Sequence, residues 1–398
     1  MDPLSYILLS CSALALFLYG MAIVATLRHT RRAPLELPED EYPPLSLLKP
    51  LKGTEESLEA NLRSFFEQDY PGTLEIVFSA TERDDPALEV ARRLAVDYPD
   101  VDTRFVFSDP EFGLNPKVSN LSGALRASRH ELVLQSDANV RAKPDYVRRV
   151  VAELISEDAQ LLSSMVAGTG ERSIGALLHN LQLSAFTAPG TCFALHWFGI
   201  VCVIGKSMLF RKKDLEDVGG LELVRDILAE DFVLGREFEK AGKKVILSPT
   251  VAVNVNVDAP VEHFIGRHAR WMKMRAVIHP PGFVIDLFSS PTALALFAFI
   301  ASGFDWRIGV VFVVVTCLKG WGDSFLVRRT RGEPLAFRHR FLAPVRDLLM
   351  LAVWPYAAVS RSVEWRGVRL RLGWQSRLRP DDGPLPLRLL RRAIAPLR

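Results

Sequence analysis

The stretch that decides the fold is Leu132-Val133-Leu134-Gln135-Ser136-Asp137-Ala138-Asn139-Val140, an apolar run that ends in a carboxylate. Helical segments precede and follow it, which is typical of a buried parallel strand in an α/β sheet. Ligands of such sheets collect at the carboxyl ends of the strands, where Asp137 can hold a divalent metal against a phosphate. The alternative is an aspartate that only caps the next turn, and this stretch alone does not decide between the two.

The two ends of the chain hold most of its excess of apolar residues. The 398-residue chain is 49% hydrophobic with a formal net charge of +3, so its composition indicates neither a nucleic-acid nor an acidic partner. Positions 4–27 carry no charge over a length sufficient to cross a hydrocarbon layer of about 30 Å. We predict an uncleaved anchor, because the run exceeds the usual core of a signal peptide and no small-residue cleavage site closes it. Arg28, Arg31 and Arg32 follow directly, which predicts that the remainder is cytosolic.

The chain divides by composition into five segments. Two further apolar runs, 287–304 and 308–318, predict a tight hairpin over about 287–327. A full third span would place the Arg-rich tail outside, so we expect 341–360 to lie in the interface or to dip in and return. The expected segments are an anchor (1–28), a linker (29–43), a cytosolic catalytic domain (44–282), a membrane region (283–362) and a cytosolic tail (363–398).

The middle of the chain alternates strand and helix patterns. Strands are predicted at 45–50, 74–79, 103–107 and 132–136, with helices at 57–68, 86–95 and 116–128 between them, which favours a doubly wound α/β sheet. Polar residues follow the strands and should meet at one crevice: Glu82 and Asp84, Asn115 and Lys117, Asp137 and Asn139. There is no GxGxxG loop, and Lys206 has five residues in place of four between the glycines of a Walker loop.

Positions 188–204 form a long apolar and aromatic stretch that includes His196 and Trp197. Such a run is usually core, and the functional alternative is a groove for a lipid acceptor that opens toward the membrane. Four cysteines show neither a zinc spacing nor a disulfide frame, which agrees with a reducing compartment. The preference for Arg over Lys is typical of a GC-rich bacterial genome, so we expect a bacterial inner membrane.

Two further motifs carry charge in a helical context. Glu230 and Asp231 begin a predicted helix, where adjacent carboxylates can simply favour the helix dipole. Arg267, Arg270 and Trp271 share one face of a helix predicted at 260–276. Two guanidinium groups beside an indole suit a diphosphate or a sugar ring, and the alternative is a solvated basic face near a membrane.

Taken together and in this order, these motifs resemble those of the ceramide glucosyltransferases and their bacterial relatives, glycosyltransferase family 21. The resemblance rests on the range 44–53, Asp84-Asp85-Pro86-Ala87, Asn115-Pro116-Lys117, Asp137, Leu228-Ala229-Glu230-Asp231-Phe232 and Arg267-His268-Ala269-Arg270-Trp271. It covers nearly the whole chain. It implies a Rossmann-like GT-A fold, a UDP-sugar donor, a lipid acceptor and a divalent metal, Mg²⁺ or Mn²⁺.

The resemblance also implies roles for single residues. Asp137, with Asn139 beside it, corresponds to the carboxylate associated with the metal and the donor diphosphate. Asp231 corresponds to the general base, with Glu230 as its neighbour. The set Arg267, Arg270 and Trp271 corresponds to the final RxxRW motif, and Asn115 and Lys117 are expected on the donor side.

This sequence departs from the family at two positions. Glu82 stands where the family usually has Asp, with Asp84 as a nearby alternative. A glutamate can still accept a hydrogen bond from the uracil or ribose of a donor. Ala188 aligns with a histidine of the animal enzymes, so their acceptor contacts are not transferred, and His196 and Trp197 are the acceptor candidates here.

The expected activity is membrane-bound, inverting transfer of glucose from UDP-glucose to the primary hydroxyl of ceramide. Alternatives within the enzyme class are transfer of N-acetylglucosamine from its UDP donor to a hopanoid polyol and glycosylation of diacylglycerol. A processive polysaccharide synthase would need more membrane spans than the sequence offers. From another class, the chain would be a membrane protein that binds a nucleotide sugar without turnover.

Overall fold

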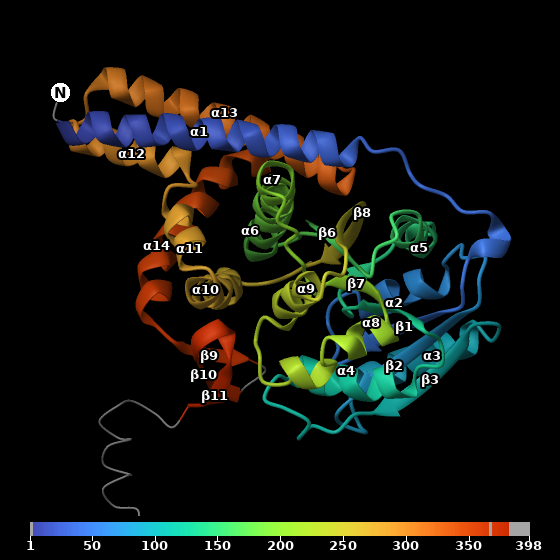
Figure 1. The fold of residues 1–398 in the computed structure, drawn as a ribbon. Helices are drawn as coiled ribbons and strands as arrows, with labels where there is room; N and C mark the ends of the chain where they lie inside the picture. Colours follow the sequence, from blue (N-terminus) through green and yellow to red (C-terminus); the bar gives the residue numbers. More distant parts are fainter. Residues whose placement is uncertain (1–2, 366–367, 382–398) are drawn as a thin grey trace, which may run out of the picture.

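A mixed sheet of eight strands forms the centre of the part that the structure describes. The computed structural model describes residues 3–365 and 368–381, and the strands lie in the order β3-β2-β1-β4-β7-β6-β8-β5 (Figure 1). Their bounds are β1 Leu45–Pro50, β2 Leu74–Ala80, β3 Asp102–Phe107, β4 Leu132–Ser136, β5 Val140–Arg141, β6 Leu161–Thr169, β7 Ser207–Arg211 and β8 Val245–Val255. The α/β class predicted from the sequence is confirmed.

The four strands predicted around Asp137 pair in parallel. β1 lies between β2 and β4, with Leu47 opposite Ile76 on one side and Leu134 on the other. The expectation of a parallel sheet holds for these strands only, because β7 runs antiparallel between β4 and β6. Since the chain builds β2 and β3 to one side of β1 and returns to place β4 on the other, the strand order reverses between β1 and β4.

Two apolar cores cover the two faces of the sheet. Successive strand residues point to opposite faces, so Leu47 and Leu134 join one core while Leu48 and Val133 join the other. The first core packs under α2, α3 and α5, and the second under α4 and α9. These helices, with the remaining soluble ones, are α2 Leu58–Phe66, α3 Pro86–Asp97, α4 Pro116–Ala127, α5 Tyr146–Ser156, α6 Ile174–Gln182, α7 Ala188–Phe198, α8 Lys212–Asp217, α9 Glu230–Lys240 and α10 Val261–Ile278.

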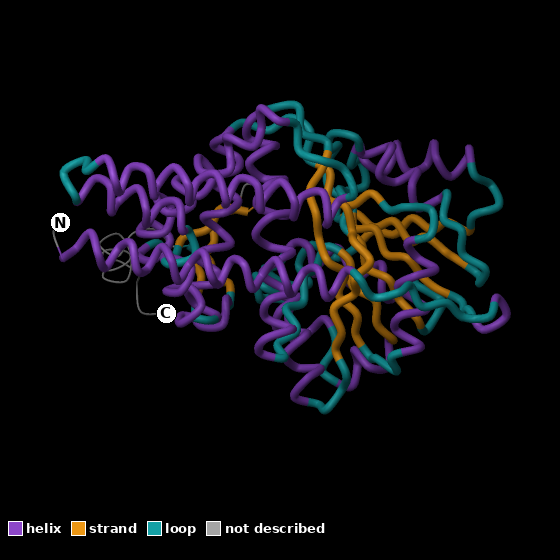
Figure 2. The backbone as a smooth tube through the Cα atoms, turned by 90° about the horizontal axis from the view of Figure 1, so that it is seen from above, coloured by secondary structure: helices purple, strands orange, loops and turns teal. Residues whose placement is uncertain are grey.

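Long apolar helices extend to one side of the sheet (Figure 2). Among the described residues, three are long and apolar enough to cross a membrane: α1 Pro3–Thr30, α13 Trp306–Arg331, and α14 Leu342–Val359 with the turn before it. A fourth span results if α11 Pro280–Leu287 and α12 Pro291–Ala301, which meet at a bend of 52°, form one broken span. Side by side with α1, α12 runs outward and α13 returns (Figure 1).

Polar contacts tie α1 into this bundle. Ser12 donates a hydrogen bond to the carbonyl of Pro291, and Tyr19 donates one of 2.7 Å to Asp323 Oδ1. Arg329, near the end of α13, donates to the carbonyl of Thr30 at the end of α1. The basic ends of α1 and α13 therefore lie side by side. In contrast, α14 leaves the bundle and packs along α10 (Figure 1).

A small antiparallel sheet follows α14, in a region where the sequence indicated only an Arg-rich tail. Its strands are β9 Ser362–Trp365, β10 Val368–Leu372 and β11 Leu378–Pro380. The backbone carbonyl of Ser376 accepts a hydrogen bond from the amide of Leu228, and its Oγ accepts one from the amide of Ala229. The small sheet thus holds the turn that precedes α9. The rest of the predicted tail, 382–398, lies outside the described residues.

Candidate active site

The candidate site lies at the carboxyl edge of the sheet, where the strand order reverses between β1 and β4. Asp137 directly follows β4. The Nζ atoms of Lys117 and Lys206 lie 3.2 Å from its Oδ1 and 3.0 Å from its Oδ2. Lys206 also donates a hydrogen bond of 2.9 Å to Asn139 Oδ1. The first turn of α4 and the residue before β7 thus supply two ammonium groups to the carboxylate at the end of β4.

The charges of this cluster shift the pKa values of its members. Burial disfavours the charged form of Asp137, but Lys117 and Lys206 outweigh it and lower the pKa of the carboxyl to about 2. Burial also opposes the charge on Lys117, yet Asp137 and the carboxylates of α9 raise its pKa. Burial lowers the pKa of Lys206. Asp137 is therefore ionised at neutral pH, and Lys117 is a fixed cation beside it.

Two carboxylates at the start of α9 join the cluster: Glu230 contacts Lys117, and Asp231 contacts the backbone amide of Gly205. Glu230 Oε1 lies 3.0 Å from Lys117 Nζ, and burial raises the pKa of this carboxyl. Asp231 Oδ2 accepts a hydrogen bond of 2.5 Å from the amide of Gly205, whose carbonyl accepts one of 2.7 Å from Lys117. A Cβ at position 205 would lie 2.8 Å from Lys117 Nζ and 3.0 Å from Asp231 Oδ2, so only glycine leaves this meeting point open.

The Asn115 side chain caps α4 with its oxygen and contacts the turn before α9 and Glu230 with its nitrogen. Its Oδ1 accepts hydrogen bonds from the amides of Lys117 and Val118 and so caps α4. Its Nδ2 donates to the carbonyl of Ile227 at 2.6 Å and lies 3.4 Å from Glu230 Oε2. Asn115 thus fixes the distance between the helix that carries Lys117 and the turn that carries the carboxylates.

Glu82 and Asp84 follow β2 but do not join the cluster. The Glu82 side chain is 59% exposed and pairs with Lys52, and Asp84 is exposed. Their neighbour Asp85 is buried, because it caps α3 and accepts from the amide of Gly53. Among the described residues no recorded contact joins Glu82 or Asp84 to Asp137. A donor role for either therefore stays a prediction.

Arg267 is held by two histidines. Its Nη1 donates to His179 Nε2 at 3.0 Å and to Asn256 Oδ1 at 3.3 Å, and His179 Nδ1 lies 2.8 Å from His268 Nε2. Arginine can only donate, so His179 accepts at Nε2, carries its proton on Nδ1 and donates to His268. Burial lowers the pKa of both histidines well below the usual range, which keeps this pair neutral. The neutral pair fixes the direction of the Arg267 guanidinium.

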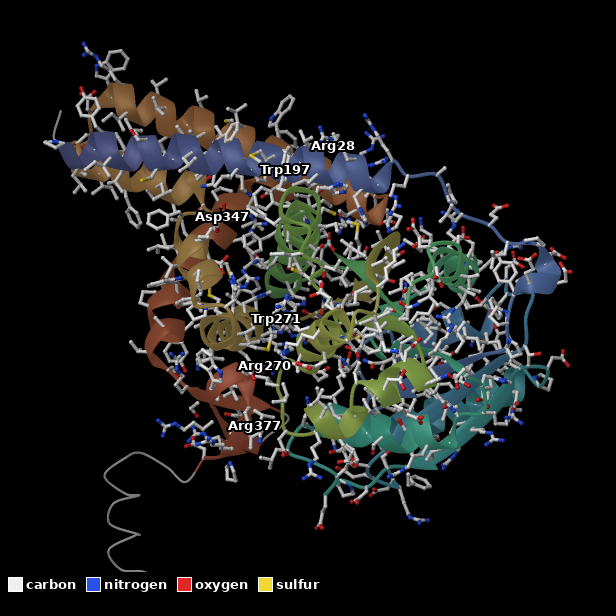
Figure 3. All side chains as sticks on the ribbon, viewed as in Figure 1. Arg28, Trp197, Arg270, Trp271, Asp347 and Arg377 are labelled. Atoms are coloured by element: carbon white, nitrogen blue, oxygen red, sulfur yellow. The ribbon has the colours of Figure 1, made fainter. Side chains whose placement is uncertain are left out.

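Arg270 and Trp271 lie on the same helix, α10, with Arg270 on the side nearer the small sheet (Figure 3). The Trp271 ring packs edge-on against His268, with ring centroids 5.0 Å apart. Arg267 and Trp271 of the RxxRW motif thus both contact the histidine pair. Burial lowers the pKa of Arg267, and the negative charges of Glu55 and, to a smaller extent, Asp137 oppose this shift.

His196 and Trp197 contact the anchor helix and not the carboxylate cluster. Trp197 Nε1 donates to the carbonyl of Met21 at 3.3 Å, and Arg28 lies over the Trp197 ring at 5.5 Å (Figure 3). The His196 ring meets that of His29 edge-on. These residues therefore lie at the basic end of α1, and their acceptor role stays a prediction.

Reading the sequence alone missed two lysines of the site. Lys206 was set aside because it does not fit a Walker loop, yet it contacts Asp137 directly. Lys49, at the end of β1, is fully buried and donates to Ser136 Oγ at 3.0 Å and to the carbonyl of Asp137 at 3.1 Å. Burial lowers its pKa well below the usual range. The available signal was a lysine within an otherwise apolar strand that ends at the site.

The two predicted metal ligands, Asp137 and Asn139, lie close together, but both contact the ammonium group of Lys206. Asp137 and Asn139 both direct an oxygen to Lys206 Nζ, at 3.0 and 2.9 Å. Within residues 3–365 and 368–381 there is no group of three or more His, Cys, Asp or Glu side chains that could hold a metal ion. Mg²⁺ and similar ions accept one or two protein oxygens when a substrate phosphate completes the shell. The donor set therefore fits a metal only together with a bound phosphate.

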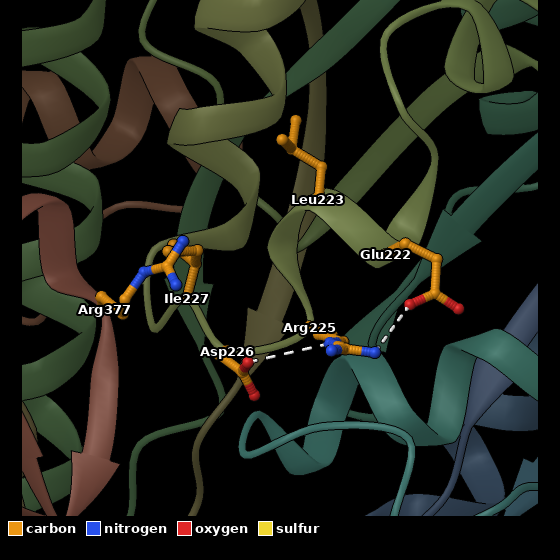
Figure 4. A pocket seen from close by; sticks show the side chains of 6 residues that line it. All are labelled: Glu222, Leu223, Arg225, Asp226, Ile227 and Arg377. Atoms are coloured by element: carbon orange, nitrogen blue, oxygen red, sulfur yellow. Dashed lines mark hydrogen bonds and ion pairs between the residues drawn. The ribbon is translucent and has the colours of Figure 1, made fainter.

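A surface hollow of about 390 Å³ lies elsewhere, beside the turn before α9 (Figure 4). Both of its carboxylates are paired with Arg225, which lies 3.2 Å from Glu222 and 3.8 Å from Asp226. It contains none of the residues predicted for the site. The carboxylate cluster between β1 and β4 is therefore the candidate active site.

Comparison with known proteins identifies the family of the chain. Residues 8–378 match the family described as Glycosyl transferase family 21. Ceramide glucosyltransferase 1 of Caenorhabditis elegans is 26% identical over 395 residues, which cover 95% of this chain and 82% of that protein. Ceramide glucosyltransferase 3 of the same organism is 26% identical over 370 residues, 91% of this chain and 80% of that protein.

Solved structures with a similar course of the chain are also glycosyl-transferring proteins by name. The mannosyltransferase PcManGT of Pyrobaculum calidifontis, solved with GDP-Man and Mn²⁺, is 15% identical, with 89% of this chain and 99% of that chain covered and a TM-score of 0.48. Glucosyl-3-phosphoglycerate synthase of Mycobacterium tuberculosis, solved with Mn²⁺, UDP and phosphoglyceric acid, is 17% identical, with 56% and 74% covered and a TM-score of 0.37.

Proposed function

Since the chain belongs to glycosyl transferase family 21 and is a membrane-associated glycosyltransferase, we propose that it transfers glucose from UDP-glucose to the primary hydroxyl of ceramide. The observation that carries this proposal is the convergence of Asp137, Glu230 and Asp231 with Lys117 and Lys206 around Gly205. The product is a β-glucosylceramide. The donor and acceptor are those suggested by the ceramide glucosyltransferases to which the chain is similar.

The reaction requires the bond between C1 of the sugar and the diphosphate to break as a new bond from the acceptor oxygen to C1 forms. Asp231, held by the amides of Gly205 and Phe232, is the proposed base that takes the proton of the acceptor hydroxyl. A single in-line attack inverts the configuration at C1, so an α-linked donor gives a β-glycoside.

The departing diphosphate gains negative charge, and the cations beside Asp137 can stabilise it. Lys117 and Lys206 are already in place, and Arg267 is aimed by His179. Asp137 and Asn139 would hold Mg²⁺ or Mn²⁺ together with the donor's phosphates, and such an ion supplies further neutralisation of the leaving group. The binding of Arg270 and Trp271 to the donor is part of the same proposal.

We further propose that the catalytic part lies in the cytosol. The basic residues at the ends of α1 and α13, among them Arg28 and Arg329, lie on the same side as the sheet. Positive residues next to spans favour the cytoplasmic side. The UDP-sugar would then reach the site directly from the cytosol, in the inner membrane if the source is bacterial.

The test is mass spectrometry of lipids from a host that expresses this chain and receives ceramide, beside an Asp231→Asn variant. We expect a hexosylceramide in the first case and a loss of about 10³-fold in turnover in the variant. Washed membranes with labelled UDP-glucose and UDP-N-acetylglucosamine separate the alternatives. A product with a hopanoid or with diacylglycerol would move the proposal to that acceptor, and UDP-sugar binding without product would leave a binding protein. Substantial turnover by the Asp231→Asn variant would show that Asp231 is not the general base.

Donor binding is tested separately with Arg270→Ala. We expect weaker binding of UDP by about tenfold, since a charge-assisted hydrogen bond is lost. Titration of UDP by calorimetry measures it, with Glu239→Gln on the outer face of α9 as the matched control. An unaltered affinity for UDP would exclude Arg270 from the donor site.

A further inference from the structure

A line of hydrogen-bonded side chains runs from the end of α13 to Arg267. It begins at Arg331, the last residue of α13, whose Nη1 donates to the two carboxylate oxygens of Glu171 at 2.9 and 3.0 Å. Asn180 of α6 donates to Glu171 Oε2 at 2.8 Å, and Asn256, which follows β8, donates to Asn180 Oδ1 at 2.8 Å. Asn256 Oδ1 in turn accepts from Arg267 at 3.3 Å. We refer to Glu171, Asn180 and Asn256 as the polar link.

The order of donors and acceptors in the polar link is fixed by its two ends. Both oxygens of Glu171 accept, so Asn180 directs its side-chain nitrogen toward Glu171 and its oxygen toward Asn256. At the other end the Arg267 guanidinium can only donate, so Asn256 presents its oxygen to Arg267 and its nitrogen to Asn180. Each asparagine therefore has one orientation that satisfies both of its neighbours, and each bond of the polar link supports the next.

The membrane end of the polar link lies where a lost partner is costly. The side chains of Arg331 and Glu171 are only 6% and 9% exposed, and Asn180 is buried. Gly168 of β6 permits the close approach of α6, because a Cβ at this position would lie 2.6 Å from the Cα atom of Asn180. The carbonyl of Gly168 also accepts a hydrogen bond from Arg331. Since a buried polar group without its partner costs more than an average hydrogen bond contributes, these contacts hold one geometry.

Two consecutive residues of α6 act on one atom of Arg267. His179 accepts from Arg267 Nη1 directly at 3.0 Å, and Asn180 reaches the same Nη1 through Asn256. Within residues 3–365 and 368–381 the Nε and Nη2 atoms of Arg267 make no hydrogen bond. These two nitrogens form one edge of the guanidinium, which is the forked arrangement that binds a phosphate with two parallel bonds. The contacts at Nη1 thus fix the group and leave its phosphate-binding edge free.

We propose that Glu171 and Arg331 are positioning residues for donor binding. Through the two asparagines they hold Nη1 of Arg267 and so set the place of its Nε and Nη2, which bind the diphosphate of the donor. This inference rests on the donor role of Arg267 in the proposed function, and it extends that role to two residues that do not touch the donor. Because Arg331 ends α13, the polar link also ties the donor site to the membrane helices.

The experiment interrupts the polar link at two points and measures UDP binding by calorimetry, with the full chain in mixed micelles. Glu171→Ala removes the acceptor next to α13. Asn180→Leu, of similar size, breaks the middle of the polar link and leaves the pair of Glu171 with Arg331 in place. We expect the Kd for UDP to rise about fivefold in both variants, the usual size of an effect transmitted through a contact network.

A control variant tests whether any ion pair near the membrane has this effect. Glu157→Ala removes a pair of 2.7 Å with Arg32, which joins the segment after α1 to the end of α5 and has no recorded contact with Arg267 among the described residues. We expect the Kd for UDP to stay unchanged in this control. If Glu171→Ala does not fold, Asn180→Leu decides the outcome, since it leaves the buried arginine paired.

Combination with Arg267→Ala separates positioning from a structural role. Arg267→Ala alone should weaken UDP binding by about tenfold, since a charge-assisted hydrogen bond is lost. If the polar link acts through Arg267, then Glu171→Ala and Asn180→Leu cause no further loss in the Arg267→Ala background. In the unaltered background they should raise the KM for UDP-glucose and leave the KM for the lipid acceptor unchanged.

Three results would overturn the inference: a further loss of UDP affinity in the Arg267→Ala background, an unchanged Kd for UDP in folded variants of the polar link, or an equal loss in Glu157→Ala. An unaltered UDP affinity in Arg267→Ala alone would instead refute the donor role of Arg267, on which the inference rests. Transfer to an acceptor other than ceramide would change the proposed function only, because the UDP titration does not need turnover and still decides the inference.

Discussion

The carboxylate cluster of the sheet and the ionic network of the membrane bundle are built from the same side-chain types but differ in balance. Around Asp137, two lysines contact one carboxylate and Arg267 lies nearby, while Gly205 keeps the centre open. In the bundle, Asp323 is satisfied on both oxygens by three donors. The difference teaches that the cluster of the sheet gathers its charges around an open centre, whereas the network of the bundle pairs its charges between helices.

Replacing one aspartate by asparagine in each region breaks this comparison most directly. Asp323→Asn removes the closest carboxylate of buried Lys319 and leaves buried Arg346 with Asp347 alone, so we expect a loss of about 3–5 kcal/mol in the free energy of unfolding. Asp137→Asn should instead leave the fold in place and lower turnover by about 100-fold or more, because the groups of the site lose their common partner. Thermal unfolding in detergent and a transfer assay measure the two effects. If Asp137→Asn unfolded more readily than Asp323→Asn, Asp137 and not Asp323 would be the residue that mainly stabilises the fold.

The histidine pair offers a second and smaller effect with a built-in control. In His179→Gln the amide oxygen can accept from Arg267 and the amide nitrogen can donate to His268, as the imidazole does. In His179→Leu neither bond forms, so we expect the KM for the UDP-sugar to rise about tenfold while His179→Gln stays close to the unaltered chain. Steady-state kinetics with the donor varied measure it. Equal losses in both variants would mean that His179 only fills space.

The smallest expected effect is one of pH. Burial lowers the pKa of His179 and His268 well below 6.5, with Arg267 adding to the shift for both. Between the lowered pKa and about 6.5 the unfolded chain binds protons that the folded chain does not, so stability falls as pH falls through this window and is constant above it. Unfolding midpoints from pH 7.5 to 5 measure it. His179→Gln should flatten the slope, and an identical slope in that variant would attribute the pH dependence to other groups.

Sequence patterns located most of the elements because the two periodicities of strand and helix are local. β1 was predicted at its observed bounds, and Asp137 was placed correctly at the end of a buried strand. The antiparallel β7 was missed, because the stretch before it has no regular alternation and its partners β4 and β6 are distant in sequence.

For the site, the residues after β3 and β4 were predicted from their positions at strand ends, whereas the paired carboxylates of α9 were predicted from the family resemblance, and the structure brings the two sets together. The contributions of Lys206 and His179 could not be found in this way, since each depends on a partner more than 60 residues away, as the contact of Lys206 with Asn139 illustrates. The exposure of Glu82 was also not visible, because a charged residue after a strand can face either the crevice or the solvent.

The contact of Ser376 with the turn before α9 has a consequence for biosynthesis. The amides of Leu228 and Ala229 find their partners only when residues beyond α14 have emerged and folded back. A nascent chain whose sheet has already folded thus lacks this restraint on the turn before α9 until the residues beyond α14 have been made. Activity would begin only after insertion is complete, which a time course of UDP-glucose turnover by stalled and released ribosome complexes can follow.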